Sequence, residues 1–459
     1  MNMANKGDGA KGNGHGHLLD ACSKAIREAL RLGASGAEAY ASRSRQITAY
    51  MESNALKHVK VGEPIGIGVR VVVDGASGFA SINSIDDVSI ESVVDGALSM
   101  ARACPRDRHN RLPEPKGRTP ALNIYDEGVE SMTVEDVAMY ARSMLRYAVE
   151  DDARVTVDSG LFDSSSIEHA VCNTNGIEAY ERISIITWSI MGMARDGSMV
   201  SNFDVQMGSS HHIKGIDVVT TAREFARSVL GSLNSRKGES FKGTMVITPN
   251  AFLELVKEPV AFAINAFNVQ RRASRFARML GKRVASDLVT IIDDATYAEG
   301  TGASSFDREG VAHRRSVIVD KGVLRGFIHN TYTASRAGVE STGNASGGIA
   351  SPPSIDTTNM VVEAGGMSYG EICREVRRGV IINRFSGNVS AVDGAFSGVV
   401  KGGHMIVDGE IAYPVREVMV AGNIYDALRS VSMVSKERRL VMDSLIPWIA
   451  VEGVSFTAG

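Results

Sequence analysis

The sequence predicts an α+β fold, with N-terminal layered units of helices and antiparallel sheets followed by a β-rich C-terminal domain. Helical apolar stripes and β-rich runs occur in blocks, and turn dipeptides separate the β-rich runs. After Val284 the β runs become short and glycine-punctuated, which predicts a barrel-like or curved-sheet arrangement. The 459 residues exceed what one hydrophobic core usually organises, so several domains are expected.

The first structured domain is expected over residues 17–104, after a disordered leader at residues 1–16 that is rich in Gly, Asn and Lys. Apolar residues at helical spacing predict a helix from Leu18 to Leu32. Two β-rich runs follow, with a hairpin turn at Asp74-Gly75. Ser84 is the expected cap of a second helix. The buried stripe of that helix should comprise Ile90, Val93, Val94, Ala97, Leu98 and Ala101.

Residues 105–130 combine proline and charge without periodicity, which is typical of a linker across the surface. A middle α+β domain is expected over residues 131–236. Its first helix should begin with a capping pair, Thr133 and Asp136, and strands should then turn at Asn175-Gly176. A last helix is expected from about Asp217, which repeats the helix–strands–helix order.

The β-rich C-terminal domain is expected over residues 237–459, with a helix opened by Thr248-Pro249. Lys and Arg number 50 against 53 Asp and Glu, without a long basic block, so nucleic-acid binding is not supported. No apolar stretch is as long as a membrane span and no signal-peptide pattern occurs, so we expect a cytoplasmic protein without membrane contact. Four distant cysteines favour reduced thiols: Cys22, Cys104, Cys172 and Cys373.

Residues 301–347 hold the densest mixture of acids, bases, hydroxyls and glycines in the chain. Composition alone favours a polar hairpin with turn residues, although such loops also carry function. A serine-type triad drawn from this segment is not favoured, because no GxSxG elbow occurs. The ingredients of that triad would be Ser341, Thr342, His329, His313 and Asp307. No phosphate-binding GxxxxGK[ST] loop occurs either.

Several short motifs follow one another along the chain in a defined order and spacing. They are Phe306-Asp307-x-Glu309-Gly310-Val311, Arg314-Arg315, Gly322-Val323-Leu324 and Ser341-Thr342-Gly343-Asn344, preceded by Gly68–Gly75 and Asn173–Gly176 and followed by Asp408-Gly409, Pro414-Val415 and Gly422-Asn423. The sequence resembles the TldD/TldE (PmbA) family over nearly its whole length. That family was once described as modulators of DNA gyrase and is now grouped with metallopeptidases.

The resemblance implies the metal-free, TldE/PmbA-like branch. TldD subunits carry HExxxH on a helix and a cysteine near the C-terminus, which together hold zinc beside a general-base glutamate. Here the comparable helix, AFLELVKEPVAFAINAF, has no histidine, and the last cysteine is Cys373. Glu254 and Glu258 are expected to be a solvated pair of acids on a helix interrupted by Pro259. His211-His212 is expected to be structural or exposed.

The resemblance therefore implies a subunit that binds unfolded peptide beside a zinc-containing, TldD-like partner and has no catalytic residue, metal ligand or cofactor of its own. In the absence of that partner the chain could form a homodimer. Two alternative functions stay open: a self-sufficient homodimeric hydrolase and a regulatory binding protein of the topoisomerase-modulator kind. The resemblance gives the substrate-binding candidates as Asp307, Glu309, Arg314, Ser341, Thr342, Gly343 and Asn344.

Overall fold

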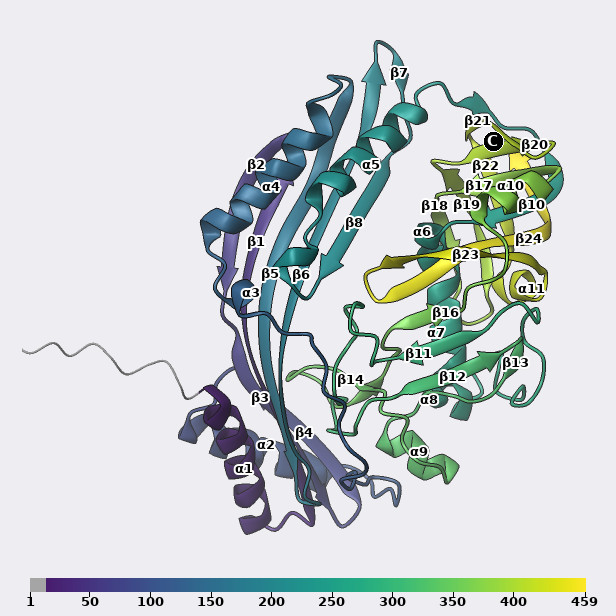
Figure 1. Cartoon of the computed structure of the whole chain (residues 1–459). Helices are drawn as coiled ribbons and strands as arrows, with labels where there is room; N and C mark the ends of the chain where they lie inside the picture. Colours follow the sequence, from purple (N-terminus) through teal and green to yellow (C-terminus); the bar gives the residue numbers. More distant parts are fainter. Residues whose placement is uncertain (1–13) are drawn as a thin grey trace, which may run out of the picture.

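The computed structural model describes residues 14–459 as a mixed α+β protein with two large sheets (Figure 1). Residues 1–13 of the expected leader lie outside the described residues, and residues 14–16 belong to helix α1 (Gly14–Arg31). The α+β class is confirmed. None of the helices in the described part of the chain has the length and hydropathy required to cross a membrane.

The N-terminal sheet has eight strands that pair antiparallel, in the order β4-β3-β1-β5-β6-β7, with β2 beside β1 and β8 beside β6. The strands are β1 (Gly36–Glu52), β2 (Ala55–Gly62), β3 (Ile65–Val73), β4 (Ala76–Ile82), β5 (Val155–Asn173), β6 (Glu178–Asp196), β7 (Met199–Val200) and β8 (Asp204–Ser210). Pairing of β1 with β5, from Glu38↔Asn173 to Glu52↔Ser159, joins the two expected N-terminal units in one sheet. The turns at Asp74-Gly75 and Asn175-Gly176 are confirmed.

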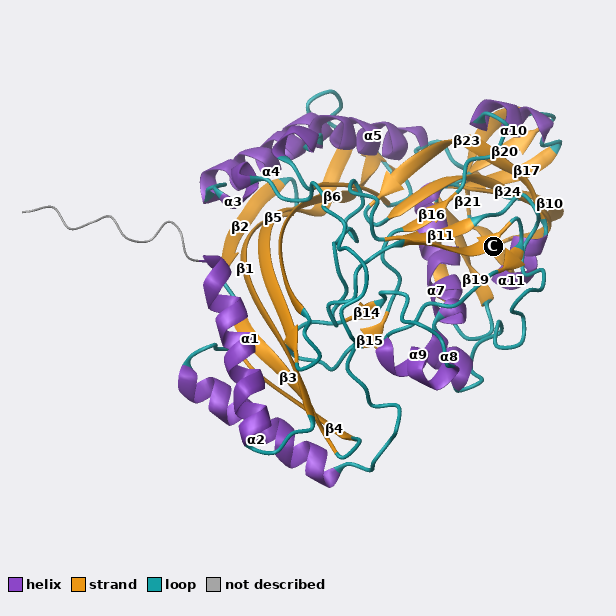
Figure 2. Ribbon diagram, turned by 60° about the horizontal axis from the view of Figure 1, so that its bottom comes forward, coloured by secondary structure: helices purple, strands orange, loops and turns teal. Residues whose placement is uncertain are grey.

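Four long helices cover one face of this sheet, and the other face lies toward the C-terminal part (Figure 2). They are α1, α2 (Asp87–Ala103), α4 (Val134–Val149) and α5 (Val218–Gly231); two short helices, α3 (Glu127–Glu130) and the 3-10 turn η1 (Ile213–Gly215), lie nearby in sequence. The α2 stripe is buried as expected, and the Thr133–Asp136 capping box is present. The expected Ser84 cap is wrong: Asp86 caps α2 by accepting from Ser89 N, and Ser84 donates to Asp86.

The C-terminal sheet has fourteen strands and does not close into a barrel, so the curved-sheet alternative holds. Most pairs are antiparallel, but three are parallel: β10 with β17, β16 with β24, and β9 with β21. The strands are β9 (Arg236–Lys237), β10 (Phe241–Ile247), β11 (Ile291–Asp294), β12 (Arg315–Asp320), β13 (Val323–Leu324), β16 (Met360–Val362), β17 (Arg378–Ile382), β18 (Arg384–Val389), β19 (Ala395–Lys401), β20 (His404–Val407), β21 (Glu410–Arg416), β22 (Val418–Asn423), β23 (Val431–Val441) and β24 (Ser444–Ala458). A separate hairpin pairs β14 (Ala345–Ser346) with β15 (Ser354–Ile355).

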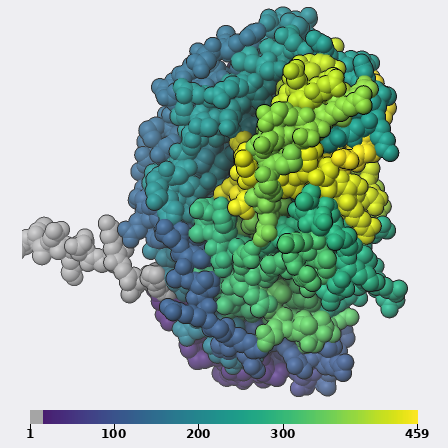
Figure 3. Space-filling model, turned by 45° about the vertical axis from the view of Figure 1, so that its right-hand side comes forward, coloured from purple at the N-terminus to yellow at the C-terminus, as the bar shows by residue number. Residues whose placement is uncertain are grey.

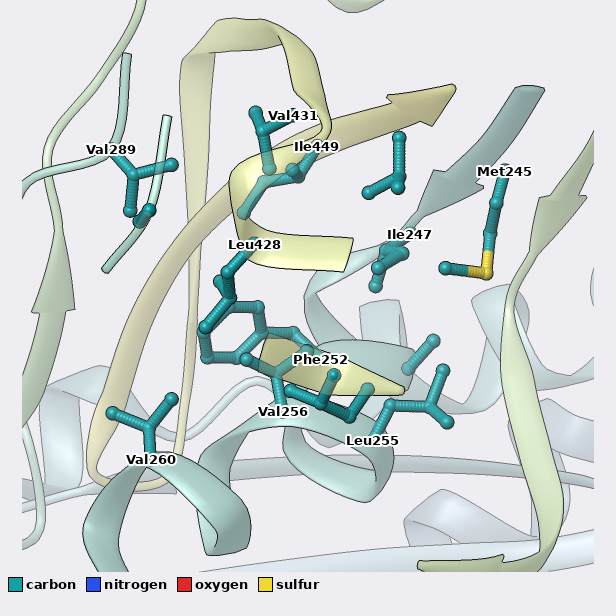
Figure 4. Close-up of a cluster of buried hydrophobic side chains, with 14 of the residues drawn as sticks. Met245, Ile247, Phe252, Leu255, Val256, Val260, Val289, Leu428, Val431 and Ile449 are labelled. Atoms are coloured by element: carbon teal, nitrogen blue, oxygen red, sulfur yellow. The ribbon is translucent and has the colours of Figure 1, made fainter. Parts of the chain in front are cut away.

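The largest hydrophobic core lies between these strands and the helix that follows β10 (Figure 4). Thr248 caps that helix, as expected. Pro259 does not interrupt it: α6 (Pro249–Phe252) continues through a π-helical turn (Leu253–Lys257) into α7 (Glu258–Ile264). The proline is tolerated because the π turn rearranges the backbone hydrogen bonds ahead of it. The remaining helices are α8 (Ala266–Gln270), α9 (Thr331–Ala337), α10 (Tyr369–Glu375) and α11 (Ile424–Arg429).

The segment between α2 and α3, residues 105–126, runs without regular structure along the side of the N-terminal sheet that faces α9; we call it the strap (Figure 1). Asn173 and Asn175 at the β5–β6 turn donate side-chain hydrogen bonds of 2.9 Å to the carbonyls of Pro113 and Leu112. On its other side, Tyr332 in α9 donates to Asp107 at 2.9 Å. The strap thus connects the N-terminal sheet to the C-terminal part. The C-terminal part packs alongside the N-terminal sheet (Figure 3).

Candidate functional site

The candidate site is built around the loop at residues 303–314, which lies where the C-terminal part meets the N-terminal sheet. Asp307 holds the loop in shape: its Oδ1 accepts from the backbone N–H groups of Glu309 and Val311, and its Oδ2 accepts from that of Ala345, all at 2.9 Å. Gly310 has a φ of +79°, and a Cβ there would lie 2.5 Å from Ile177. The turn therefore requires glycine for both conformation and space.

Two glutamates and two arginines form a buried network across the junction. Arg70 Nη2 donates to Glu38 Oε2 at 2.6 Å and to Glu309 Oε1 at 2.8 Å. Glu309 Oε2 also accepts from the backbone N–H of Thr331 at 2.8 Å, which ties the loop to the first turn of α9. Arg308 Nη1 lies 3.3 Å from Glu38 Oε1, and its guanidinium lies 4.1 Å from the centre of the Tyr40 ring. The formal charges balance, as buried ions require.

The environment of this network shifts several pKa values. Burial, together with the neighbouring Glu309 carboxylate, raises the pKa of Asp307 to about 8, although three backbone N–H groups oppose the shift. Burial also raises the pKa of Glu38 and lowers that of Arg308. For Arg70, burial acts to lower the pKa, but the Glu38 and Glu309 carboxylates outweigh it and raise the value. The arginine charge is therefore retained.

A cavity of about 270 Å³ opens between this loop and β5; we call it the inner cavity. Its ionisable lining residues are Tyr40, His169, Asp307, Arg308, His313 and Asp356, and Asn344 is among its uncharged polar ones. Burial, with Arg308 as a second cause, lowers the pKa of His169 to about 4, and burial lowers that of His313 to about 4. Both imidazoles are therefore neutral at neutral pH. Asn344 Nδ2 donates to Asp293 Oδ2 at 2.6 Å.

A larger cavity, of about 530 Å³, lies between the strap and the segment from α9 to Ser341; we call it the strap groove. Arg314 and Ser341 line its C-terminal side, and Arg314 Nη2 donates to the Ser341 carbonyl at 3.0 Å. Ala312 and Arg314 face this groove whereas His313 lines the inner cavity. Residues 312–314 therefore form part of the wall between the two cavities.

Four of the seven candidates line these two spaces. Asp307 and Asn344 line the inner cavity, and Arg314 and Ser341 line the strap groove. Glu309 is fully buried in the network and lines neither. Thr342 and Gly343 connect the two spaces: the Thr342 hydroxyl contacts Asn344 Oδ1 at 2.7 Å, and Gly343 has a φ of +75°.

The network residues on the N-terminal sheet were not foreseen from the sequence. Glu38 and Tyr40 alternate with buried alanines along β1, so they share the face opposite the helices. Arg70 on β3 and His169 on β5 lie on the two strands that flank β1 in the same sheet. The usable signal was this period-two placement of large polar residues within otherwise apolar strands.

The proposed serine-type ingredients do not assemble into a triad. The Asp307 carboxylate accepts from backbone groups, and the His329 ring contacts the Thr333 hydroxyl at 3.2 Å. Ser341 Oγ lies 3.2 Å from the His329 carbonyl rather than from its ring. Within the residues described, no chain of hydrogen bonds links an acid through an imidazole to a hydroxyl among these five.

The helix expected to correspond to the zinc-binding helix has other contacts. Glu254 is not a solvated acid: it accepts from Arg384 Nε at 2.9 Å and from the Phe385 backbone N–H at 2.5 Å. His211 is structural, as expected, with its ring nitrogens 2.6 Å and 3.1 Å from the carbonyls of Ser184 and Gly300. Across residues 14–459, no cluster of three or more His, Cys, Asp or Glu side chains fits a metal ion. These residues do not fit zinc.

Comparison with known proteins gives consistent matches along the chain. PmbA/TldA metallopeptidase domain 1 matches residues 37–101, the central domain matches residues 127–233, and the C-terminal domain matches residues 240–458. Metalloprotease PmbA of Escherichia coli O157:H7 is 25% identical over 426 residues, covering 90% of this chain and 91% of that protein. A Metalloprotease TldD homolog of Haemophilus influenzae is 24% identical over 418 residues, covering 88% and 86%.

The fold agrees with these matches. The crystal structure of TldE from Thermococcus kodakarensis has a TM-score of 0.89 to this chain at 23% sequence identity, covering 95% of this chain and 100% of that one. The three consecutive domain matches span nearly the whole chain, and the family resemblance read from the sequence is confirmed. The chain belongs to the PmbA/TldD metallopeptidase family.

Proposed function

We propose that this chain is the metal-free, TldE/PmbA-like subunit of a cytoplasmic heterodimer, in which it holds unfolded peptide and a TldD-like partner cleaves the peptide with zinc. One observation carries the proposal: the helix at Pro249–Ile264 has no histidine, and its Glu254 carboxylate is committed to Arg384 and the Phe385 backbone. A metallopeptidase site needs imidazole, thiolate or carboxylate ligands with an open position, and this helix offers none in that arrangement.

The seven candidate residues take two roles in this proposal. Asp307 and Glu309 are positioning residues, because their carboxylates are occupied by backbone N–H groups and by Arg70. Arg314, Ser341, Thr342, Gly343 and Asn344 form the wall between the inner cavity and the strap groove, where a peptide has access. Among these, Arg314 has an exposed, charged side chain that is free to meet a peptide group.

The test uses the purified chain, a TldD-like subunit and an unstructured peptide with a fluorogenic bond. We expect no cleavage by the chain alone, and chelator-sensitive cleavage by the mixture that exceeds that of the TldD-like subunit alone. The Arg314→Ala variant should raise the KM of the mixture while the two subunits still co-elute on gel filtration, because the exposed side chain forms no ion pair with any of residues 14–459. Arg325→Ala, which removes an exposed arginine outside both cavities, is the matched control.

Other results would favour the alternatives. Cleavage by the isolated chain that a chelator does not change would support the self-sufficient homodimeric hydrolase. A mixture no faster than the TldD-like subunit alone, with no complex on gel filtration, would contradict the heterodimer and leave the regulatory binding protein. Unchanged KM in Arg314→Ala would remove Arg314 from the peptide path.

A further inference from the structure

The strap groove concentrates positive charge in a protein whose net charge is −3. Arg108, Arg111 and Lys116 line it from the strap, and Arg314 lines it from the opposite wall. Two acids, Glu114 and Glu340, also line it. Four cations therefore face two carboxylates, an excess that opposes the sign of the whole chain.

Three of the four cations form no ion pair with any acid among residues 14–459, although Lys116 and, more weakly, the charge of Arg314 lower the pKa of Glu340. Lys116 Nζ pairs with Glu340 Oε1 at 2.9 Å, which neutralises one cation and one acid. The three arginines instead make these contacts: Arg108 Nε reaches His109, Arg111 Nε reaches the Arg108 carbonyl, and Arg314 Nη2 reaches the Ser341 carbonyl. In residues 14–459 none of the three forms an ion pair with a carboxylate. Their guanidinium groups retain donors for an external anion.

Apolar residues also line the groove beside these charges. Leu112 and Pro113 are buried residues of the strap that line the groove, and Val311 and Ala312 line the facing wall. Val339 lies at the rim with 54% of its surface exposed, which leaves apolar area available for a ligand. An extended peptide presents side chains alternately to opposite sides, so it can place carboxylates on the arginines and small apolar groups on the floor.

The groove is also held at a fixed width by contacts between its two walls. His109 Nδ1 lies 3.2 Å from Ser335 Oγ in α9, and Tyr332 donates to Asp107 at 2.9 Å. The exposed Lys116–Glu340 pair, at 2.9 Å, is a third contact between the strap and the facing wall. A site whose width is set before binding loses less conformational entropy when a ligand enters.

We propose that the strap groove binds a carboxylate-rich, extended segment of the peptide substrate, with Arg108, Arg111 and Arg314 donating hydrogen bonds to its carboxylates. This inference rests on the proposed peptide-binding function and names the class of peptide that the chain selects. Arginine suits the task, because its planar fork donates two parallel hydrogen bonds to a carboxylate.

The experiment measures fluorescence anisotropy of a labelled, unstructured peptide of alternating Glu and Ala on the isolated full-length chain. A peptide with Gln at every Glu position has the same length. Its Kd should be at least about tenfold higher, since each lost charge-assisted hydrogen bond costs affinity. Added salt should weaken binding of the Glu peptide, because the groove is open to solvent and its charges are screened.

Arg111→Gln should weaken binding of the Glu peptide, and the double variant Arg111→Gln/Arg314→Gln should weaken it further, by about tenfold or more in Kd. Lys60→Gln is the matched control: Lys60 is exposed on β2, carries the same charge and does not line the groove. Thermal melting of all variants should agree with the unmodified chain, because the substituted side chains are exposed and outside the core.

Equal affinity for the Glu and Gln peptides, or no effect of Arg111→Gln, would overturn the assignment. So would an unstructured oligonucleotide of the same charge that binds as tightly and competes with the Glu peptide. Failure here is separable from failure of the proposed function: a mixture with a TldD-like subunit that cleaves Glu and Gln peptides equally well would keep the subunit role and remove the acidic preference. Arginine-dependent binding of the Glu peptide without stimulated cleavage would keep the acidic preference and remove the subunit role.

Discussion

Arg70 and Glu309, 239 positions apart in the chain, form a charge-assisted hydrogen bond of 2.8 Å between Nη2 and Oε1. The same nitrogen meets Glu38 at 2.6 Å, so one guanidinium joins the first strand of the N-terminal sheet to the loop of the candidate site. Side-chain exposure is 11% for Arg70 and 0% for both glutamates. The position of the loop therefore depends on an ionic interaction with the N-terminal sheet.

Arg70→Met should destabilise the protein by about 3–5 kcal/mol, because it leaves two buried carboxylates without their shared cation. Urea unfolding of the full chain measures the change. Arg325→Met is the control: its pair with Asp320 at 2.9 Å is exposed, and its loss should cost about 1 kcal/mol or less. Equal losses in the two variants would show that the buried network does not stabilise the junction.

His169 should make the stability of the fold sensitive to acid. Its pKa is about 4 in the folded protein, below the ordinary value of 6.5, because burial and Arg308 oppose protonation. Glu181 lies 3.6 Å from the ring, but its carboxylate already accepts from Ser304 Oγ at 2.6 Å and Ser305 N at 2.8 Å. A lowered pKa means that the stabilising contribution is present above pH 6.5 and lost as the pH falls toward 4.

The comparison of His169→Phe with the unmodified chain isolates this effect. Phenylalanine retains the ring contacts with Tyr40 and Phe306 and does not titrate. Between pH 6.5 and pH 5 the unmodified chain should lose about 1.5 kcal/mol relative to the variant, because the unfolded imidazole is half protonated at pH 6.5 and the slope approaches about 1.4 kcal/mol per pH unit only below that. Urea unfolding at both pH values measures the difference. A constant difference across this range would mean that His169 takes up its proton in the folded state near its ordinary pKa.

Local patterns were predictable from the sequence because their causes are local. The apolar stripe of α2 follows helical spacing, and the Thr133–Asp136 capping box spans one turn. The Ser84 cap failed by two positions, because Ser84, Asp86 and Asp87 all suit a helix start and only Asp86 reaches the Ser89 N–H.

The candidate site was only half predictable, because its other half depends on pairing between distant strands. Pattern and resemblance identified residues 307–314 and 341–344, which are close together in sequence. Glu38, Arg70 and His169 enter through the β1–β3 and β1–β5 pairings, which no short-range signal specifies. The resemblance also could not distinguish Glu309, whose side chain is fully buried, from Arg314, whose side chain is exposed.

Gly310→Ala tests the geometry of the loop directly. The residue has a φ of +79°, and the added Cβ would lie 2.5 Å from Ile177 and 2.9 Å from Val171. Gly338→Ala is the matched control, since its φ is +68° but nothing lies within 4 Å of a Cβ there. Gly338→Ala should cost about 1 kcal/mol for backbone conformation, and Gly310→Ala should cost about 1–3 kcal/mol more through overpacking. Similar losses in urea unfolding would contradict the close packing of the loop on β5.

Asn344→Asp should destabilise the protein in a pH-dependent way. Asn344 Nδ2 donates to Asp293 Oδ2 at 2.6 Å, and burial already raises the pKa of Asp293 to about 6. The substitution replaces the donor with a second carboxylate, so one of the two acids must hold a proton to keep the contact. Because the folded state then binds more protons than the unfolded state, stability should fall as the pH rises from 5 to 8.

Exchange of the two groups provides the control. Asp293→Asn/Asn344→Asp restores one amide and one carboxylate at the same contact, and an asparagine at position 293 can still accept from the Thr358 N–H, now 2.7 Å from Asp293 Oδ1. Urea unfolding at pH 5 and pH 8 should show a loss of about 2 kcal/mol or more at pH 8 for the single variant and substantial recovery in the exchange. If the single variant has the same stability at both pH values, or the exchange recovers nothing, then the Asn344–Asp293 bond does not hold the wall between the inner cavity and the strap groove.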